Sequence, residues 1–487
     1  MSKISACLSI GLLASLISFS QKKKPVDAGE KFKTEAMTGI QAGYDEYKNI
    51  ALQIWDHAEL GYKEVKSSSL LQETLKKNGF TVEAGVAGIP TAFVASYGSG
   101  QPVIALLAEY DALPGLSQRA IPERSSIEGK NGGHGCGHNL FGTASVAAGI
   151  ELKKLLEQKK ISGTIKVFGC PAEEGGSGKV YMVREGLFND VDIAIHWHPG
   201  AENGTTMVSA LANSSAKFRF KGIASHAAAA PEKGRSSLDA VESMNYMVNM
   251  MREHVPQETR IHYVITNGGK APNVIPDFAE VYYYVRHPNR EQVKQIFERV
   301  VKAAKGAGLG TETEMTYEII GGTHDLLLNR SLAELVQHNL ERTGGVKYTS
   351  EELIFAKSIQ SSLGYAAPSL AMADSILPLK LQPETGASMG STDVGDVSYV
   401  VPTVGFTTAT FVPGTPMHSW QAVASGGTDI GVKGLIVAAK TMALTAIDLY
   451  THPEYIQKAK TEFKQQLGNY KYEALLGDRK PALNYRD

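Results

Sequence analysis

Apolar runs and helical patterns alternate along the first half of the chain. Val103–Ala108 is a continuous apolar run, as expected for a strand that is buried on both faces of a sheet. Thr164–Cys170 and Val191–Ile195 repeat this pattern, and apolar residues recur at helical spacing between the runs. Strands that alternate with helices predict an α/β fold with a mainly parallel sheet.

Polar residues follow each of these predicted strands directly. Glu109 and Asp111 follow the first strand, Glu173-Glu174 follows the second, and His196-Trp-His198 follows the third. In a parallel sheet the carboxyl ends of the strands meet at one edge, where ligands usually bind. We therefore expect these side chains to share one site.

Helical patterns flank the strands. One extends from Met37 to Asn78 and stops at Gly79, and another contains Phe141, Ala144 and Leu152. Asn139 is expected to be the N-cap of this second helix.

The pattern changes between residues 214 and 323. Two-faced strands and amphipathic helices follow one another there in the order β-α-β-β-α-β, which is typical of a split βαβ (ferredoxin-like) domain. The mixed α/β pattern resumes afterwards. We therefore expect a catalytic domain formed by residues 30–213 and 324–487, interrupted by an inserted lid or dimerisation domain over 214–323.

Composition and charge narrow the classes of partner. The 487 residues include 49 basic and 50 acidic side chains, and this balance argues against a general affinity for nucleic acid or anionic membranes. A small molecule or a peptide is the expected substrate.

The N-terminus has the pattern of a secretory signal peptide over residues 1–20. Lys3 precedes an apolar run that ends at Phe19, and small residues precede a cleavage site near Ser20. An uncleaved anchor is the weaker alternative because the run is short for a membrane span. We expect an exported, periplasmic protein whose mature chain has no membrane span.

The loop Gly132–Asn139 contains a thiol and two imidazoles among glycines. Cys136 and His138 can point to one side and offer sulfur and nitrogen to one cation, although such a loop alone could equally be a flexible connection. If Cys7 leaves with the signal peptide, Cys136 and Cys170 remain, which are too few for a disulfide framework. Cys170 has the position of a buried apolar residue.

Other residues strengthen the metal-binding interpretation. These residues are Glu174, His196 and His418. Together with Cys136 and His138 they offer enough ligands for two divalent cations. Glu173 points away from Glu174 in an extended backbone, and it is placed to take a proton from water. On its own, the Glu173-Glu174 pair could instead be a solvated acidic turn.

The motifs together resemble the dinuclear metallopeptidase family of aminoacylases, N-acyl-amino-acid amidohydrolases and related carboxypeptidases. The resemblance covers residues 40 to 445, and the motifs occur in the order of the family: Asp111-Ala-Leu-Pro, Cys136-Gly-His138, Glu173-Glu174-Gly, His196-x-x-Pro199, Ser225-His226-Ala, Asn273-Val-Ile-Pro and Pro416-Met-His418-Ser. Gly135–Ala144 and Gly390–Asp396 are similar to a branch of that family whose substrate is p-aminobenzoyl-glutamate.

The resemblance implies a metal-dependent amidohydrolase with two divalent ions, Mn²⁺ or Zn²⁺ and possibly Co²⁺. It implies that Cys136, His138, Glu174, His196 and His418 bind metal and that Glu173 is the general base. His226 would act at the site of a partner subunit in a homodimer, or in a heterodimer with a related subunit. Asn273 and Arg286 would bind substrate.

Some assignments stay open in the sequence. The His-x-x-Pro spacing favours His196 over His198 as a ligand, and His134 has no assigned role. Asp111 is expected to support a ligand rather than to bind metal, and Asp393 and Asp396 either shape the pocket or cap a helix. Two alternative functions are an aminopeptidase or dipeptidase, and a non-catalytic metal-binding subunit.

Overall fold

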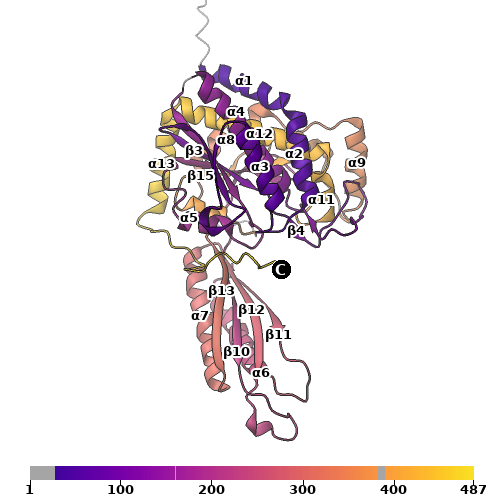
Figure 1. Ribbon diagram of the computed structural model, residues 1–487, viewed down its shortest axis with the longest axis vertical. Helices are drawn as coiled ribbons and strands as arrows, with labels where there is room; N and C mark the ends of the chain where they lie inside the picture. Colours follow the sequence, from indigo (N-terminus) through magenta and orange to yellow (C-terminus); the bar gives the residue numbers. More distant parts are fainter. Residues whose placement is uncertain (1–27, 160, 382–389, 487) are drawn as a thin grey trace, which may run out of the picture.

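The computed structural model describes residues 28–159, 161–381 and 390–486. The proposed signal peptide over residues 1–20 lies outside these residues. The chain forms a large α/β domain from which a second, elongated domain projects (Figure 1). The elongated part is built from the middle of the sequence, so the large domain consists of two segments on either side of an insertion.

A mixed sheet forms the centre of the large domain. Its four strands β6, β3, β7 and β15 are parallel, whereas β1 and β2 add an antiparallel edge. In sheet order the strands are β1 (Thr81–Ala84), β2 (Phe93–Ser99), β6 (Gly163–Cys170), β3 (Val103–Glu109), β7 (Ile193–Ile195) and β15 (Thr403–Val404).

Strand β3 shows why the sequence forms a buried sheet. All its residues are buried, and its side chains alternate between two apolar cores. Ile104 and Leu106 face the core beneath the N-terminal and C-terminal helices, whereas Ala105 and Leu107 face the core that contains α5 and α10. A continuous apolar run therefore marks a strand covered on both faces, as predicted.

Helices cover both faces of this sheet. The expected helical stretch from Met37 to Asn78 is interrupted, because Ala58 adopts a left-handed conformation with φ 43° at the end of α2. The helices are α1 (Ala28–Ala42), α2 (Tyr44–His57), α3 (Val65–Lys77), α4 (His138–Lys159), α5 (Gly178–Arg184), α8 (Arg330–Thr343), α9 (Ser350–Ser361), α10 (Val394–Ser398), α11 (Trp420–Gly426), α12 (Asp429–Thr451) and α13 (Pro453–Leu467).

Short elements complete the large domain. A second small sheet has the order β14-β9-β16-β8, and β4 pairs with β5. These strands are β4 (Leu113–Pro114), β5 (Gly132–Gly133), β8 (His198–Gly200), β9 (Gly204–Met207), β14 (Lys380–Leu381) and β16 (Phe406–Ala409), with 3-10 turns at Val86–Gly88 and Leu370–Ala373.

Asn139 is not the N-cap of α4. The helix already begins at His138, after Gly137 with φ 75°. The Asn139 amide instead donates to the carbonyl oxygens of Ala51 and Gly426, each at 3.3 Å. It therefore links α4 to α2 and α11 inside the core.

Helix α12 is apolar and long enough to cross a membrane by length and composition. Within the structure, however, 89% of its most apolar stretch is buried. It packs against α4, α1 and α8 and so is the central helix of the main core.

The inserted domain has the predicted β-α-β-β-α-β order. Its antiparallel sheet has the strand order β11-β12-β10-β13, and α6 and α7 cover one face. The elements are β10 (Ala212–Lys221), α6 (Ser237–Met251), β11 (Arg260–Asn267), β12 (Phe278–His287), α7 (Arg290–Gly310) and β13 (Glu314–Thr323), with 3-10 turns at Pro231–Lys233 and Arg252–His254. The first strand thus begins two residues before position 214, and the last ends at 323.

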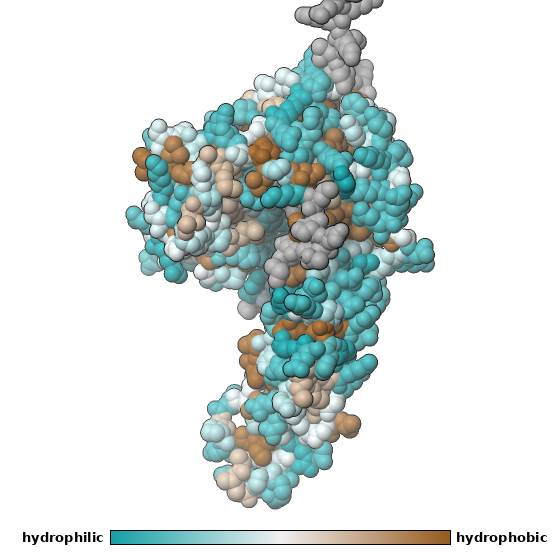
Figure 2. Space-filling view, turned by 180° about the vertical axis from the view of Figure 1, so that it is seen from behind, coloured by the Kyte–Doolittle hydropathy of each residue, from teal (hydrophilic) through white to brown (hydrophobic). Residues whose placement is uncertain are grey.

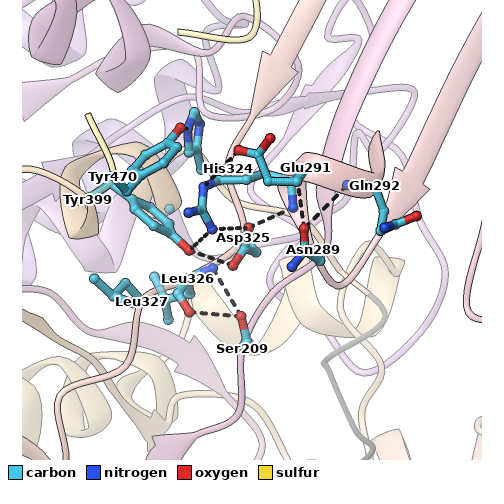
Figure 3. A network of polar contacts seen from close by, with 12 residues as sticks. Ser209, Asn289, Glu291, Gln292, His324, Asp325, Leu326, Leu327, Tyr399 and Tyr470 are labelled. Atoms are coloured by element: carbon cyan, nitrogen blue, oxygen red, sulfur yellow. Dashed lines mark hydrogen bonds and ion pairs between the residues drawn. The ribbon is translucent and has the colours of Figure 1, made fainter. Parts of the chain in front are cut away.

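Polar and aromatic side chains form the contacts between the inserted domain and the large domain (Figure 3). The Arg290 guanidinium, at the start of α7, stacks between the rings of Tyr399 and Tyr470, at 4.2 and 3.9 Å from their centroids. Asp325 accepts hydrogen bonds from the Arg290 backbone N–H at 3.0 Å and from the Tyr399 hydroxyl at 2.7 Å. The junction therefore contains contacts from both domains and from the C-terminal segment.

Candidate metal centre

The loops at the carboxyl ends of β3, β6 and β7 meet, as the strand pattern predicts. Two more loops join them, one before α4 and one before α11. Glycines permit this close approach because a side chain would collide with the neighbouring loop. A Cβ added to Gly135 would lie 3.2 Å from the α-carbon of His418, and one added to Gly137 would lie 2.6 Å from Pro199.

His138 is fully buried and fixed by Asp111. Its Nδ1 lies 2.9 Å from Asp111 Oδ1, and its Nε2 lies 3.1 Å from Glu109 Oε2. Burial disfavours the charged ring, but these two carboxylates raise the pKa of His138 well above its usual value. A cation at Nε2 would take the place of the proton there. The other oxygen of Asp111, Oδ2, accepts the backbone N–H of Glu174 at 2.9 Å. Asp111 thus has the supporting position expected from the sequence.

Cys136 lies against His198 and not against His196. The Cys136 Sγ is 3.4 Å from His198 Nε2, and His198 Nδ1 donates to the Pro199 carbonyl at 2.7 Å. Burial and the charge of Glu174 raise the pKa of the Cys136 thiol above its usual range. The thiol is therefore not activated as a nucleophile, and its conversion to a thiolate needs a cation nearby.

The sequence favours His196 as a ligand, but the structure places His198 beside Cys136 instead. The backbone of His196 still continues β7, because its N–H donates to Val404 O at 3.0 Å. Its ring lies against Gly405, where a Cβ would be 2.2 Å from His196 Nε2. Between the two histidines the chain leaves the central sheet and enters β8, so only His198 points to Cys136.

Glu174 and His418 form the other side of the centre. Glu174 Oε1 lies 3.0 Å from His418 Nε2. Burial alone would raise the pKa of Glu174, but the contact with His418 and the charge of His138 lower it below the usual value. His418 sits in a left-handed turn with φ 58°, and its backbone N–H donates to Gly135 O at 2.9 Å.

A buried ion cluster lies beside Glu173, and the sequence interpretation missed it. The Lys179 ammonium contacts Glu109 Oε1 at 2.5 Å and Asp393 Oδ1 at 2.7 Å, and Glu109 Oε2 is 3.1 Å from His138 Nε2. Asp393 therefore holds Lys179 and does not cap α10 with its side chain. Asp396 likewise binds His324 and Tyr472. A lysine near the start of a short helix gives no sequence signal of burial.

The pKa of Glu173 is raised well above its usual value. Burial contributes most, followed by the charges of Glu109, Glu174 and Asp393, while Lys179 opposes them. A carboxylate with a raised pKa among other carboxylates is typical of a general base.

Three overlapping groups of side chains bring their ligand atoms within 4.8 Å of one another. The buried atoms His138 Nε2 and Glu174 Oε1 contact other candidate ligands, Glu109 Oε2 at 3.1 Å and His418 Nε2 at 3.0 Å. A cation between these groups would replace such contacts. The sulfur, nitrogen and oxygen donors suit borderline divalent metals. The groups are Cys136 with His138 and His198, Cys136 with Glu174 and His418, and Glu109 with His138 and Glu173.

The three remaining site candidates lie on the inserted domain. His226 is exposed, its Nδ1 accepts the backbone N–H groups of Ala228 and Ala229, and it bridges to the segment that contains Asn273. The two loops that contain these residues, one after β10 and one between β11 and β12, lie at the tip of the inserted domain away from the large domain (Figure 1). Arg286 pairs with Asn213 at the opposite end of the sheet. The fold of one chain therefore does not bring His226 or Asn273 to its own metal centre.

Comparison with known proteins places this geometry in a family. A family model described as a peptidase dimerisation domain matches residues 212–312. The p-aminobenzoyl-glutamate hydrolase of Escherichia coli (strain K12) has a subunit that is 44% identical over 449 residues, which cover 88% of this chain and 93% of that subunit. The Xaa-Arg dipeptidase of Mus musculus is 28% identical and covers 90% of this chain and 93% of its own length.

Solved structures have the same fold. The aminobenzoyl-glutamate utilization protein from Klebsiella pneumoniae superposes with a TM-score of 0.58 at 18% identity, over 85% of this chain and 98% of that one. A dinuclear metal-binding peptidase of the M20 family from Bacillus subtilis gives 0.57 at 17% identity, over 84% and 99%. The chain belongs to the M20 peptidase family with its inserted dimerisation domain, and it is a hydrolase.

Proposed function

We propose that this enzyme is a metal-dependent amidohydrolase that cleaves p-aminobenzoyl-glutamate into p-aminobenzoate and glutamate. The observation that carries the proposal is the cluster of Cys136, His138, Glu174, His198 and His418 beside the half-buried Glu173. The 44% identity to a relative with that substrate in its name supports the choice of acyl group.

The ligand set would hold two divalent ions, Mn²⁺ or Zn²⁺ and possibly Co²⁺. His138 and His198 each direct one ring nitrogen to a hydrogen-bond acceptor and the other to the centre, which is the usual arrangement of metal-binding histidines. When bound, two such ions would lower the pKa of a water molecule and polarise an amide carbonyl.

Glu173 would move the proton. Its carboxylate accepts a proton from the attacking water and returns it to the amine nitrogen of the leaving amino acid. The neighbouring carboxylates Glu109 and Asp393 favour the protonated form of Glu173, and Lys179 prevents the pKa from rising further. The proton is therefore held beside the scissile bond between the two transfers.

Asn273 and His226 would act on the substrate in the site of a partner subunit, because the loops that contain them lie at the far tip of the inserted domain.

The inserted domain has the features of a surface that pairs with another subunit. Its edge strand β11 exposes Val264 by 56%, and α6 exposes Tyr246 by 67%. Figure 2 shows apolar surface on this domain between polar regions. An unpaired strand edge with apolar side chains favours pairing with another sheet.

The partner would be a second copy or a related subunit. Mixing chains tests the trans arrangement: His226→Ala chains and Glu173→Gln chains, each inactive alone, should regain activity when they assemble together. Recovery is expected because a mixed dimer contains one site with both intact residues. No recovery in assembled mixed dimers would exclude action of His226 across the interface.

A dipeptidase is the second candidate, because the Xaa-Arg dipeptidase covers a similar share of the chain at lower identity. A panel of N-acyl amino acids and free-amine dipeptides separates the two. A pocket for a protonated amine needs a carboxylate that an aryl pocket does not need. We expect the highest kcat/KM for p-aminobenzoyl-glutamate, and faster cleavage of dipeptides would favour the second candidate.

Export remains a proposal that rests on the N-terminal sequence. Expression of the full chain followed by fractionation and N-terminal sequencing tests it. We expect a mature chain that begins near Gln21 in the periplasmic fraction. A full-length chain in the cytoplasmic fraction would contradict it.

A further inference from the structure

The last described residues reach the candidate metal centre. After α13, residues 468–486 form an irregular segment that runs along the junction of the two domains (Figure 1). Its last described side chains are Tyr485 and Arg486. The Tyr485 hydroxyl donates to the Glu174 carbonyl oxygen at 3.1 Å, and Arg486 Nη2 donates to the same oxygen at 2.5 Å.

We propose that Tyr485 and Arg486 are positioning residues that hold the Glu174 carbonyl and so set the affinity of one of the two metal sites. The proposal rests on the metal-binding role proposed above for Glu174. It adds to that role a segment which the motifs of the sequence do not include.

The two peptide groups that flank the Glu174 α-carbon are both held. The Glu174 N–H donates to Asp111 Oδ2 at 2.9 Å, and Asp111 also fixes His138. The Glu174 carbonyl is held by the two C-terminal donors. With both peptide groups held, the backbone on either side of the Glu174 α-carbon is fixed, and so is the direction in which its side chain leaves toward His418.

The loop that carries Glu174 needs such support. Ala172 and Ser177 adopt left-handed conformations, with φ 57° and 60°, and Gly175 has φ 93°. Non-glycine residues keep this conformation only where surrounding contacts impose it. The Ala172 N–H donates to Glu64 Oε1 at 2.8 Å, and the Tyr62 hydroxyl donates to Gly176 O at 2.6 Å.

The two terminal side chains are themselves fixed. The Tyr485 ring packs edge-on against Tyr62 with centroids 5.5 Å apart, and the Arg486 guanidinium lies 4.8 Å from the Tyr485 ring centroid. Both contacts keep the two donors directed at one carbonyl.

Contacts along residues 468–486 position the end of this segment beside Glu174. Leu476 is 1% exposed in the core beneath α5. Arg184 Nη1 donates to the carbonyls of Gly477 and Arg479, and Arg479 Nη1 donates to Ile320 O of the inserted domain at 2.6 Å. The segment is thus anchored on both domains before it reaches Glu174, and loss of its last residues leaves these anchors intact.

The test is a competitive titration of the full chain with Zn²⁺ alone in the presence of a chromophoric chelator. The variants are a truncation after Asn484, Tyr485→Phe, Arg486→Gln and Arg486→Lys, with a truncation after Arg486 as the matched control. The melting temperature of each chelator-treated chain reports whether the fold is unchanged.

We expect the truncation after Asn484 to weaken one metal equivalent by about tenfold or more, and to leave the other within about twofold. Tyr485→Phe and Arg486→Gln should give intermediate losses. Arg486→Lys should recover part of the affinity because it restores a donor, and the control truncation should match the parent. The melting temperatures should not change.

Two results would overturn the proposal. In the first, both equivalents bind to the truncated chain as they do to the parent. In the second, both weaken together with a lower melting temperature, so that the segment only stabilises the fold. A parent chain that binds fewer than two equivalents would instead contradict the proposed function as well, so the two failures are distinguishable.

Discussion

Asp111 Oδ1 lies 2.9 Å from His138 Nδ1, and both side chains are fully buried. This contact joins the end of β3 to the start of α4 and turns Nε2 of the imidazole toward Glu109 and Glu173. Because the second oxygen of Asp111 binds the Glu174 N–H, one carboxylate orients two candidate ligands.

Asp111→Asn should therefore lower metal affinity by about 10- to 100-fold, because the amide turns an N–H toward one of two donors. Titration with Zn²⁺ measures the effect, and Asp374→Asn, at an exposed position, is the control. Unchanged affinity in Asp111→Asn would contradict the supporting role.

Substitution of the two neighbouring histidines should give different results. His198→Ala removes the nitrogen that lies 3.4 Å from Cys136 Sγ and should remove one metal equivalent. His196→Ala should retain both equivalents, because the His196 ring lies against Gly405. The number of bound metal ions is measured after dialysis. If only His196→Ala lost a metal ion, His196 would be the ligand, as the His-x-x-Pro spacing predicts.

Lys179→Met should strongly destabilise the fold. Lys179, Glu109 and Asp393 are each at most 2% exposed, so the variant leaves two buried carboxyl groups without their cation. The expected loss is about 3–5 kcal/mol in the free energy of unfolding, measured by urea denaturation.

The double variant Lys179→Met/Asp393→Asn is the matched control for Lys179→Met. It should recover part of the stability because it removes one of the two uncompensated carboxyl groups. A double variant no more stable than the single one would argue against this charge cluster as the cause.

His134 should make the stability of the fold sensitive to acid. Burial, followed by the nearby charge of His138, lowers the pKa of His134 from 6.5 to about 3. The unfolded chain protonates this imidazole below about pH 6.5, whereas the folded chain keeps it neutral. Its contribution to stability is thus complete above pH 6.5 and is lost as the pH falls toward 3.

His134→Gln tests this, because the amide keeps a donor for Ile54 O and cannot be protonated. The melting temperature of the chelator-treated variant should fall less between about pH 7 and 5 than that of the parent. An equal fall in both would show that His134 does not contribute to the pH dependence.

Much of the fold could be predicted because its signals are local. The apolar run of β3 indicates a strand buried on both faces, and the order of elements in the insertion identifies the split βαβ plan. Since chemistry in parallel sheets gathers at the carboxyl ends of strands, Cys136, His138 and Glu174 could be grouped before the structure was known.

The rest depends on contacts between distant parts of the chain. His196 and His198 differ only in where the backbone leaves one sheet for another, which no spacing reveals. Lys179 pairs with Asp393, more than two hundred positions away, and the sequence around it does not mark it as buried. The segment around Tyr485 has no periodicity, so its arrival at Glu174 follows only from tertiary packing.

The central claim is that Glu173 moves the proton in a metal centre formed by its neighbours. Glu173→Gln measures this most directly, with metal content and turnover of p-aminobenzoyl-glutamate determined on the same preparation. We predict two bound metal equivalents, as in the parent, and a fall in kcat of about 10²- to 10⁴-fold. A fully loaded variant that is as active as the parent would contradict the account.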